Sequence, residues 1–172
     1  MKLAYTMAPG RGDTDLVLHA LACSIIEQGH RPVGTVQINT ESDAGPCDMD
    51  VKILPDGGTI RISQTLGRAS RGCRLDPAAL ETAVGLVEAE LFKGADCLIV
   101  NKFGKHEAEG RGFRSVIAEA LARDIPVLVG INRLNRDAFL DFVDGFAAEL
   151  VPELPVLEEW LKSAFTDGAA AA

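Results

Sequence analysis

Residues 97–107 read Cys-Leu-Ile-Val-Asn-Lys-Phe-Gly-Lys-His-Glu, a short apolar run that turns polar and cationic. Residues 97–100 are continuously apolar and rich in β-forming side chains, which predicts a central parallel strand that is covered on both faces. In open α/β sheets, ligands bind just past the carboxyl ends of such strands. We therefore expect the polar residues that follow to meet a ligand: Asn101, Lys102, Lys105, His106 and Glu107.

Strand and helix patterns alternate on both sides of this segment. Apolar runs predict strands at residues 3–8, 33–38 and 126–131. Helical spacing predicts helices from residue 13 or 14 to Gly29 and at residues 77–92, 112–123, 135–150 and 156–164. Runs 49–54 and 59–63 predict a half-exposed β-hairpin, and residues 39–48 and 64–76 are expected to be loops. This order predicts an α/β fold, a three-layer, doubly wound, mostly parallel sheet with an inserted β-hairpin.

Length, charge and cysteine usage narrow the class of protein. The 172 residues suit one domain, which we assign to residues 1–166, and the alanine-rich tail 167–172 is expected to be disordered. A formal net charge of -8 argues against a nucleic-acid binder. The four cysteines show no CxxC spacing, and the chain has neither a signal-peptide pattern nor an apolar run long enough to cross a bilayer. We expect a cytoplasmic protein that does not bind membranes, and we leave its oligomeric state open.

A glycine-rich turn follows the first predicted strand, in the layout that holds an anion at a helix N-terminus. Measured against the P-loop pattern G-x-x-x-x-G-K-[ST], the chain keeps Gly12 and Thr14 but has Met7 for the first glycine and Asp13 for the lysine. A carboxylate there would repel phosphate, whereas Arg11 could supply positive charge. Alternatively, Asp13 only caps the helix in a tight turn. The expected anion-binding residues are Gly10, Arg11, Gly12, Asp13 and Thr14.

Residues 95–113, together with residues 73–76 upstream and 125–128 downstream, resemble the bacterial domain-of-unknown-function family 2478. The resemblance covers almost the whole chain. That family is similar to the cancer-related and thermophilic nucleoside-triphosphatase family of P-loop proteins. Its members are often found beside molybdenum-transport or nitrogen-fixation functions. The resemblance implies a fold of the P-loop nucleoside-triphosphatase type and a link to molybdate handling.

The triphosphatase family carries the segment Asp-Glu-Ile-Gly-x-x-Glu after the corresponding strand. Gly104 and Glu107 match that segment, whereas Asn101 stands where the resemblance implies the magnesium-organising aspartate. Lys102 stands where it implies a water-activating glutamate. Metal-assisted phosphoryl transfer needs these acids, so magnesium binding is doubtful and efficient hydrolysis is not expected. Glu107 is the remaining catalytic candidate.

Three loops are expected to converge at the carboxyl edge of the sheet and to gather cationic side chains there. A small anionic ligand is the expected partner, either a nucleotide or another oxyanion such as molybdate. An alternative is that these cations form surface ion pairs, Arg74 with Asp76 and Lys105 with Glu109, which stabilise little. No metal ligand set is predicted, and the role of Cys73 in the second loop is left open. The cationic residues are Arg11; Arg68, Arg71 and Arg74; and Lys102, Lys105, His106, Arg111 and Arg114.

The leading interpretation is a P-loop-derived protein that binds a nucleotide or oxyanion, with degenerate phosphate and magnesium motifs. Two alternatives remain open. One is a slow nucleoside triphosphatase in which Glu107 organises water or metal and Thr14 touches magnesium. The other is a non-catalytic interaction module that uses its acidic C-terminal helices.

Overall fold

The computed structural model describes residues 2–42, 45–64 and 75–169, and it has the predicted three-layer α/β architecture. The strands run in the order β4-β3-β2-β5-β6-β1-β7 in one sheet of the described residues. Neighbours among β2, β5, β6, β1 and β7 pair in parallel, whereas β3 and β4 add an antiparallel edge. The strands are β1 (Leu3–Thr6), β2 (Pro32–Ser42), β3 (Gly45–Leu54), β4 (Thr59–Arg61), β5 (Cys97–Phe103), β6 (Val127–Ile131) and β7 (Ala148–Leu150).

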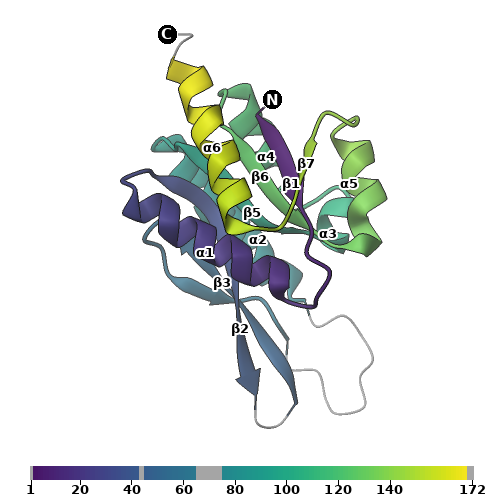
Figure 1. Ribbon diagram of the computed structural model, residues 1–172. Helices are drawn as coiled ribbons and strands as arrows, with labels where there is room; N and C mark the ends of the chain where they lie inside the picture. Colours follow the sequence, from purple (N-terminus) through teal and green to yellow (C-terminus); the bar gives the residue numbers. More distant parts are fainter. Residues whose placement is uncertain (1, 43–44, 65–74, 170–172) are drawn as a thin grey trace.

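The helices form two layers, one on each face of the sheet (Figure 1). On one face, α1 and α6 pack on a buried cluster that includes Leu18, Ile99 and Leu157. On the other face, α2, α4 and α5 pack on a cluster that includes Val100 and Phe139. The helices are α1 (Asp13–Glu27), α2 (Pro77–Phe92), α3 (Lys105–Ala108), α4 (Arg114–Ala122), α5 (Arg136–Phe142) and α6 (Leu154–Ala169), with a 3-10 turn η1 (Arg133–Asn135).

Strand β5 is buried from Cys97 to Asn101, as the apolar run predicts, and lies between β2 and β6. Strand β6 separates β5 from β1. The glycine turn begins at the carboxyl end of β1 and the polar segment at that of β5, so only the end of β6 lies between them in the sheet. The segment after β6, which includes η1, follows the strand between them.

The antiparallel part of the sheet is larger than predicted. The hairpin between β3 and β4 is confirmed, with Asp50 opposite Arg61. The prediction of a loop at residues 39–48 is wrong, because β2 continues to Ser42 and pairs with β3 from Gly45 onward. Polar residues pair well in such a ladder, since its hydrogen bonds come from the backbone. In Figure 1 this long hairpin projects from the body of the domain.

The predicted single helix at residues 135–150 is also wrong. Helix α5 ends at Phe142, and β7 then adds a parallel strand beside β1. Asp144 and Gly145 have φ values of 49° and 72°, a left-handed conformation that cannot continue a right-handed helix. The chain therefore turns and returns to the sheet.

Helix bounds elsewhere differ by a few residues. The short helix α3 lies in a segment expected to be a loop, and α4 begins at Arg114 rather than at residue 112. Helix α6 continues to Ala169, into the tail that was expected to be disordered, and residues 170–172 lie outside the described residues. Among the described residues, no helix has the length and apolar character needed to span a bilayer.

Candidate functional site

The glycine turn leads into α1 with the geometry of an anion-binding turn. Gly12 caps α1 at φ 86°, a left-handed conformation that glycine adopts without strain. The Thr14 hydroxyl accepts a hydrogen bond from the Ala8 N–H at 2.9 Å and closes the turn. A Cβ on Gly10 would overlap the Asp13 carboxylate, so this carboxylate lies against the turn itself. An anion bound here would meet negative charge unless the exposed Asp13 side chain rotated away.

The side chain of Asn101 in β5 is buried and forms hydrogen bonds with α1 and β2, a bridge that we call the latch. Its Nδ2 donates to Asp15 Oδ1 at 2.8 Å, and its Oδ1 accepts the Gln37 N–H at 2.9 Å. The residue is 2% exposed. The latch ties the carboxyl end of β5 to β2 and to the first turn of α1. A direct contact between Asn101 and a ligand stays a prediction, and the geometry gives the side chain a structural role.

The cations expected at this edge differ in their pairing. Arg11 and Lys102 are exposed and form no ion pair with any described residue. Lys105 Nζ lies 3.6 Å from Glu109 Oε1, and Arg111 Nη2 lies 2.8 Å from Glu109 Oε2. These ion pairs include the Lys105–Glu109 pair that the sequence offered as an alternative. Arg111 in particular holds the pKa of Glu109 below its usual range.

Glu107 is buried, and its carboxylate holds the backbone of the segment after β5. Oε2 accepts the Gly104 N–H at 2.9 Å in a capping box at α3, and Oε1 accepts the Phe113 N–H at 3.4 Å. A Cβ on Gly112 would overlap the same carboxylate. Burial raises the pKa of Glu107 above its usual value. Because both oxygens face backbone donors, the geometry gives Glu107 a structural role, and its catalytic role stays a prediction.

His106 forms a dyad with a residue that the sequence did not single out. Its Nε2 lies 2.6 Å from Oε1 of Glu81, one turn into α2. The same oxygen accepts the Gly112 N–H at 3.1 Å. The hydrogen bond to His106 is the main cause that lowers the pKa of Glu81. At neutral pH Glu81 is therefore a carboxylate that anchors the histidine and the following loop.

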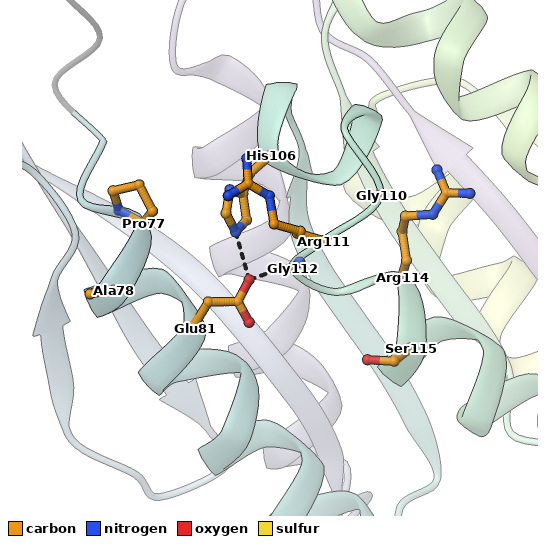
Figure 2. Close-up of a pocket in the computed structure, with 9 residues that line it drawn as sticks. All are labelled: Pro77, Ala78, Glu81, His106, Gly110, Arg111, Gly112, Arg114 and Ser115. Carbon is orange, nitrogen blue, oxygen red and sulfur yellow. Dashed lines mark hydrogen bonds and ion pairs between the residues drawn. The ribbon is translucent and has the colours of Figure 1, made fainter.

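The dyad lines a pocket of about 570 Å³ between α2 and α4 (Figure 2). The Arg111 side chain lies beside His106 in this view, whereas the Arg114 side chain turns away. The guanidinium carbon of Arg114 instead lies 4.2 Å from the centre of the Phe142 ring. Nη1 of Arg114 donates to the Glu107 carbonyl oxygen at 3.3 Å. The lining residues are Pro77, Ala78, Glu81, His106, Gly110, Arg111, Gly112, Arg114 and Ser115.

The predicted single site therefore divides into two groups. Contacts join the start of α1 to Asn101, and separate contacts join His106, Glu107 and the 110–114 segment to α2. Arg68, Arg71, Arg74 and Cys73 lie outside the described residues. In the part of the chain that the structure describes, no group of three His, Cys, Asp or Glu side chains could hold a metal ion. Asn101 does not fit a magnesium site, because its amide nitrogen and its amide oxygen both already form hydrogen bonds within the protein.

Sequence reasoning missed Asp15, Gln37 and Glu81. Asp15 lies in the first turn of α1, three residues after Gly12, but its pairing with Asn101 depends on the strand order. Glu81 is one acid on a long helix, and no local pattern marks it. The segment after β6 was also missed; there Asn132 caps η1 by accepting the Asn135 N–H at 3.0 Å.

Comparisons with known proteins agree with the fold. A family model described as a protein of unknown function (DUF2478) matches residues 3–160. The chain is 35% identical over 161 residues to a protein of Bradyrhizobium diazoefficiens named molybdenum import ATP-binding protein ModC 2. The match covers 92% of this chain and 18% of that relative, so this chain spans less than a fifth of the relative's length.

Two solved structures have the same fold. The solution structure of a human cancer-related nucleoside triphosphatase matches with a TM-score of 0.61 and 16% identity, over 100% of both chains. The crystal structure of THEP1 from the hyperthermophile Aquifex aeolicus matches with a TM-score of 0.62 and 16% identity, over 95% of this chain and 96% of that chain. The fold of the P-loop nucleoside-triphosphatase type is thereby confirmed.

Proposed function

This chain belongs to the family described as a protein of unknown function (DUF2478), as its sequence predicts, and we propose that it is an anion-binding protein. The ligand is a tetrahedral oxyanion, either free or as the phosphate of a nucleotide. It binds at the carboxyl edge of the sheet beside the glycine turn. The protein does not hydrolyse it efficiently.

The surroundings of Asn101 support the proposal that hydrolysis is inefficient. A carboxylate at this position would face the carboxylate of Asp15, whose Oδ1 lies 2.8 Å from Asn101 Nδ2. Two buried carboxylates at such a distance cannot both be ionised without a cation between them. The amide removes this conflict without a metal, and it also removes the acid that magnesium-dependent hydrolysis needs.

The proposal of anion binding is supported by the turn and by two exposed cations. Backbone N–H groups at the start of the 15-residue helix α1 favour an anion, and Gly12 gives the turn its left-handed bend. Arg11 and Lys102 are exposed, and neither forms an ion pair with a described residue. These cations can therefore meet a ligand without first breaking an ion pair with a described residue.

Molybdate and tungstate are the first oxyanions to test. The sequence relative is named as a molybdenum import ATP-binding protein, and this chain corresponds to 18% of it. Phosphate and sulfate present oxygens of similar geometry to N–H donors, so selectivity has to be measured. Slow hydrolysis of a nucleoside triphosphate is the second candidate, because Gly12 and Thr14 keep their P-loop positions at the start of α1. The interaction-module alternative stays a prediction.

Isothermal titration calorimetry tests the proposal with molybdate, tungstate, phosphate, sulfate and ATP at one ionic strength. We expect saturable binding of at least one of them to the wild-type protein, and loss of about tenfold in affinity in R11A and in K102A. K93A is the matched control, because Lys93 is an exposed lysine at the far end of α2.

Equal weakening in K93A would show a general charge effect and contradict the proposed site. Absence of binding by every ligand would contradict the function. If R11A and K102A bound the anion as tightly as the wild-type protein, the binding site would not lie at the glycine turn.

A further inference from the structure

The pocket between α2 and α4 is built from different residues than the glycine turn. Its volume is about 570 Å³, and its lining comes from α2, α3, the 110–112 loop and α4. None of its lining residues belongs to α1 or to the turn before it. It is therefore a concave feature separate from the glycine turn.

Within this pocket, His106 presents one free ring nitrogen. The residue is 4% exposed, and its Nε2 is held 2.6 Å from Glu81 Oε1. A carboxylate oxygen only accepts hydrogen bonds, so Nε2 carries the hydrogen and neutral His106 has a lone pair on Nδ1. No described residue bonds to Nδ1. Among the described residues, every fully buried side-chain nitrogen or oxygen has a partner, so an Nδ1 without a partner is not fully buried. Nδ1 is therefore open to the pocket that His106 lines.

The other side chains of the pocket give it a defined polarity. Arg111 lines the pocket together with His106, and the two side chains overlap in the view of Figure 2. The Glu81 Oε1 atom is already covered by the His106 ring and by the Gly112 N–H at 3.1 Å. Gly112 also lines the pocket, and its φ of 63° and the lack of room for a Cβ mean that this position requires glycine.

We propose that this pocket is a second ligand site, which takes a small oxyanion that carries an acidic hydroxyl, such as hydrogen phosphate or a phosphate monoester. The guanidinium of Arg111 binds the charged oxygens, and Nδ1 of His106 accepts a hydrogen bond from the hydroxyl of the ligand. Glu81 is a positioning residue that selects the tautomer in which Nδ1 is the acceptor. The site does not depend on the anion proposed for the glycine turn.

The test follows the imidazole signals of His106 by NMR in full-length protein. Sodium phosphate and glycerol phosphate are titrated separately at constant ionic strength, with sodium chloride as the reference salt. The signals of His106 are assigned by their loss in H106Q. We expect saturable shifts with phosphate or the monoester and none with chloride. A tighter response to one of the two identifies the free anion or the ester as the preferred form.

Three variants make the result specific. R111Q should weaken the response about tenfold, because Arg111 is exposed and its replacement leaves the fold intact. R123Q is the matched control, since Arg123 forms a similar ion pair with Glu119 at the other end of α4. R11A removes the charge of the glycine turn and should leave the response unchanged.

A linear response, or an equal response to chloride, would overturn the second site. So would full binding by R111Q. If R11A rather than R111Q removed the response, the anion would bind at the glycine turn; the second site would fail and the proposed function would stand. E81Q removes the negative charge of Glu81 but keeps the positioning of His106, because the amide oxygen of glutamine can still accept a hydrogen bond from Nε2. It should keep binding within about threefold, and a larger loss would contradict the positioning role of Glu81.

Discussion

The carboxyl end of β5 has two sides that differ in how their charges are neutralised. On the α1 side, Asp15 and Asn101 are buried and bonded to each other. Arg11 before α1 and Lys102 in β5 are exposed, and neither forms an ion pair with a described residue. On the α2 side the arrangement is reversed, because the cation Arg111 is paired with Glu109 and the histidine is buried against an acid.

This difference shows that cationic residues near one strand end need not form one site. A free cation offers its charge to a ligand directly. The acidic partner of a paired cation neutralises part of its charge. A site built on such a cation therefore needs a further polar group, such as Nδ1 of His106.

The largest effect is expected when the amide of the α1-side latch becomes an acid. N101D places a second carboxylate beside Asp15 in a buried position, so one of the two has to hold a proton or separate from the other. We expect a loss of about 3 kcal/mol in the free energy of unfolding, measured by urea denaturation at pH 7.

The swapped double variant D15N/N101D is the matched control for this change. It restores one amide and one carboxylate, so at least half of the lost stability should return. It also puts an acid at the end of β5, which allows a direct assay for magnesium-dependent ATP hydrolysis. If N101D alone were as stable as the wild-type protein, the latch would have no structural role.

A smaller loss is expected at Glu107, whose carboxylate accepts two backbone N–H groups. E107Q can satisfy only one of these donors and turns an N–H toward the other, which should cost about 2 kcal/mol by the same denaturation assay. E109Q, at an exposed acid two residues away, should cause no measurable change. Equal stability of E107Q and the wild-type protein would remove Glu107 as the support of this loop.

The raised pKa of Glu107 also predicts how the free energy of unfolding depends on pH. Burial raises the pKa of Glu107 in the folded protein above its ordinary value of 4.5. The folded protein then binds more protons than the unfolded chain, so the contribution of Glu107 declines as pH rises from about 4.5 through the folded pKa. E107Q should flatten this slope in urea titrations at several pH values; a slope unchanged in E107Q would assign it to another group.

A change in ligand affinity is expected at Asp13, whose carboxylate lies against Gly10 in the glycine turn. D13A removes this negative charge and should raise the affinity for the best-binding anion about tenfold, or about 1.4 kcal/mol. D13K should raise it further, since it restores the P-loop lysine. Calorimetry measures both. A lower affinity in D13A would mean that Asp13 helps to build the site.

The smallest effect is expected at Glu81, which is 47% exposed despite its bond to His106. E81Q should cost under about 1 kcal/mol at pH 7, because solvent screens a half-exposed pair. The folded pKa of Glu81 is lowered, so its contribution is present above 4.5 and is lost as pH falls through the folded pKa. The difference between E81Q and the wild-type protein should therefore vanish in strong acid. A difference that grew on acidification would contradict this sign.

Local pattern was enough to predict β5, the helix that begins at Pro77 and the hairpin of β3 with β4, because burial and turn chemistry act within a few residues. It was not enough for β7, which exists because β1 offers it a free edge. The candidate site shows the same limit. Asn101 was found from its strand, but its bond to Asp15 depends on how α1 crosses the sheet.

His106 and Lys102 are four residues apart, and this spacing predicts a single site for both. Burial separates them, since His106 is buried and bonds to Glu81 of α2, whereas Lys102 is exposed. A sequence lists the charges of a segment without saying which of them will find a partner. That pairing decides which cations can serve a ligand.

The most direct measurement is the shift in melting temperature of the wild-type protein with ATP, GTP, molybdate, tungstate, phosphate and sulfate, each with and without Mg²⁺ at one ionic strength. Selective binding stabilises by mass action, whereas a general salt effect appears with every anion. We predict a selective shift that does not need Mg²⁺, is lost in R11A and K102A, and comes without ATP turnover. A shift that requires Mg²⁺ and accompanies turnover, or no selective shift with any of these anions, would contradict a magnesium-independent anion site.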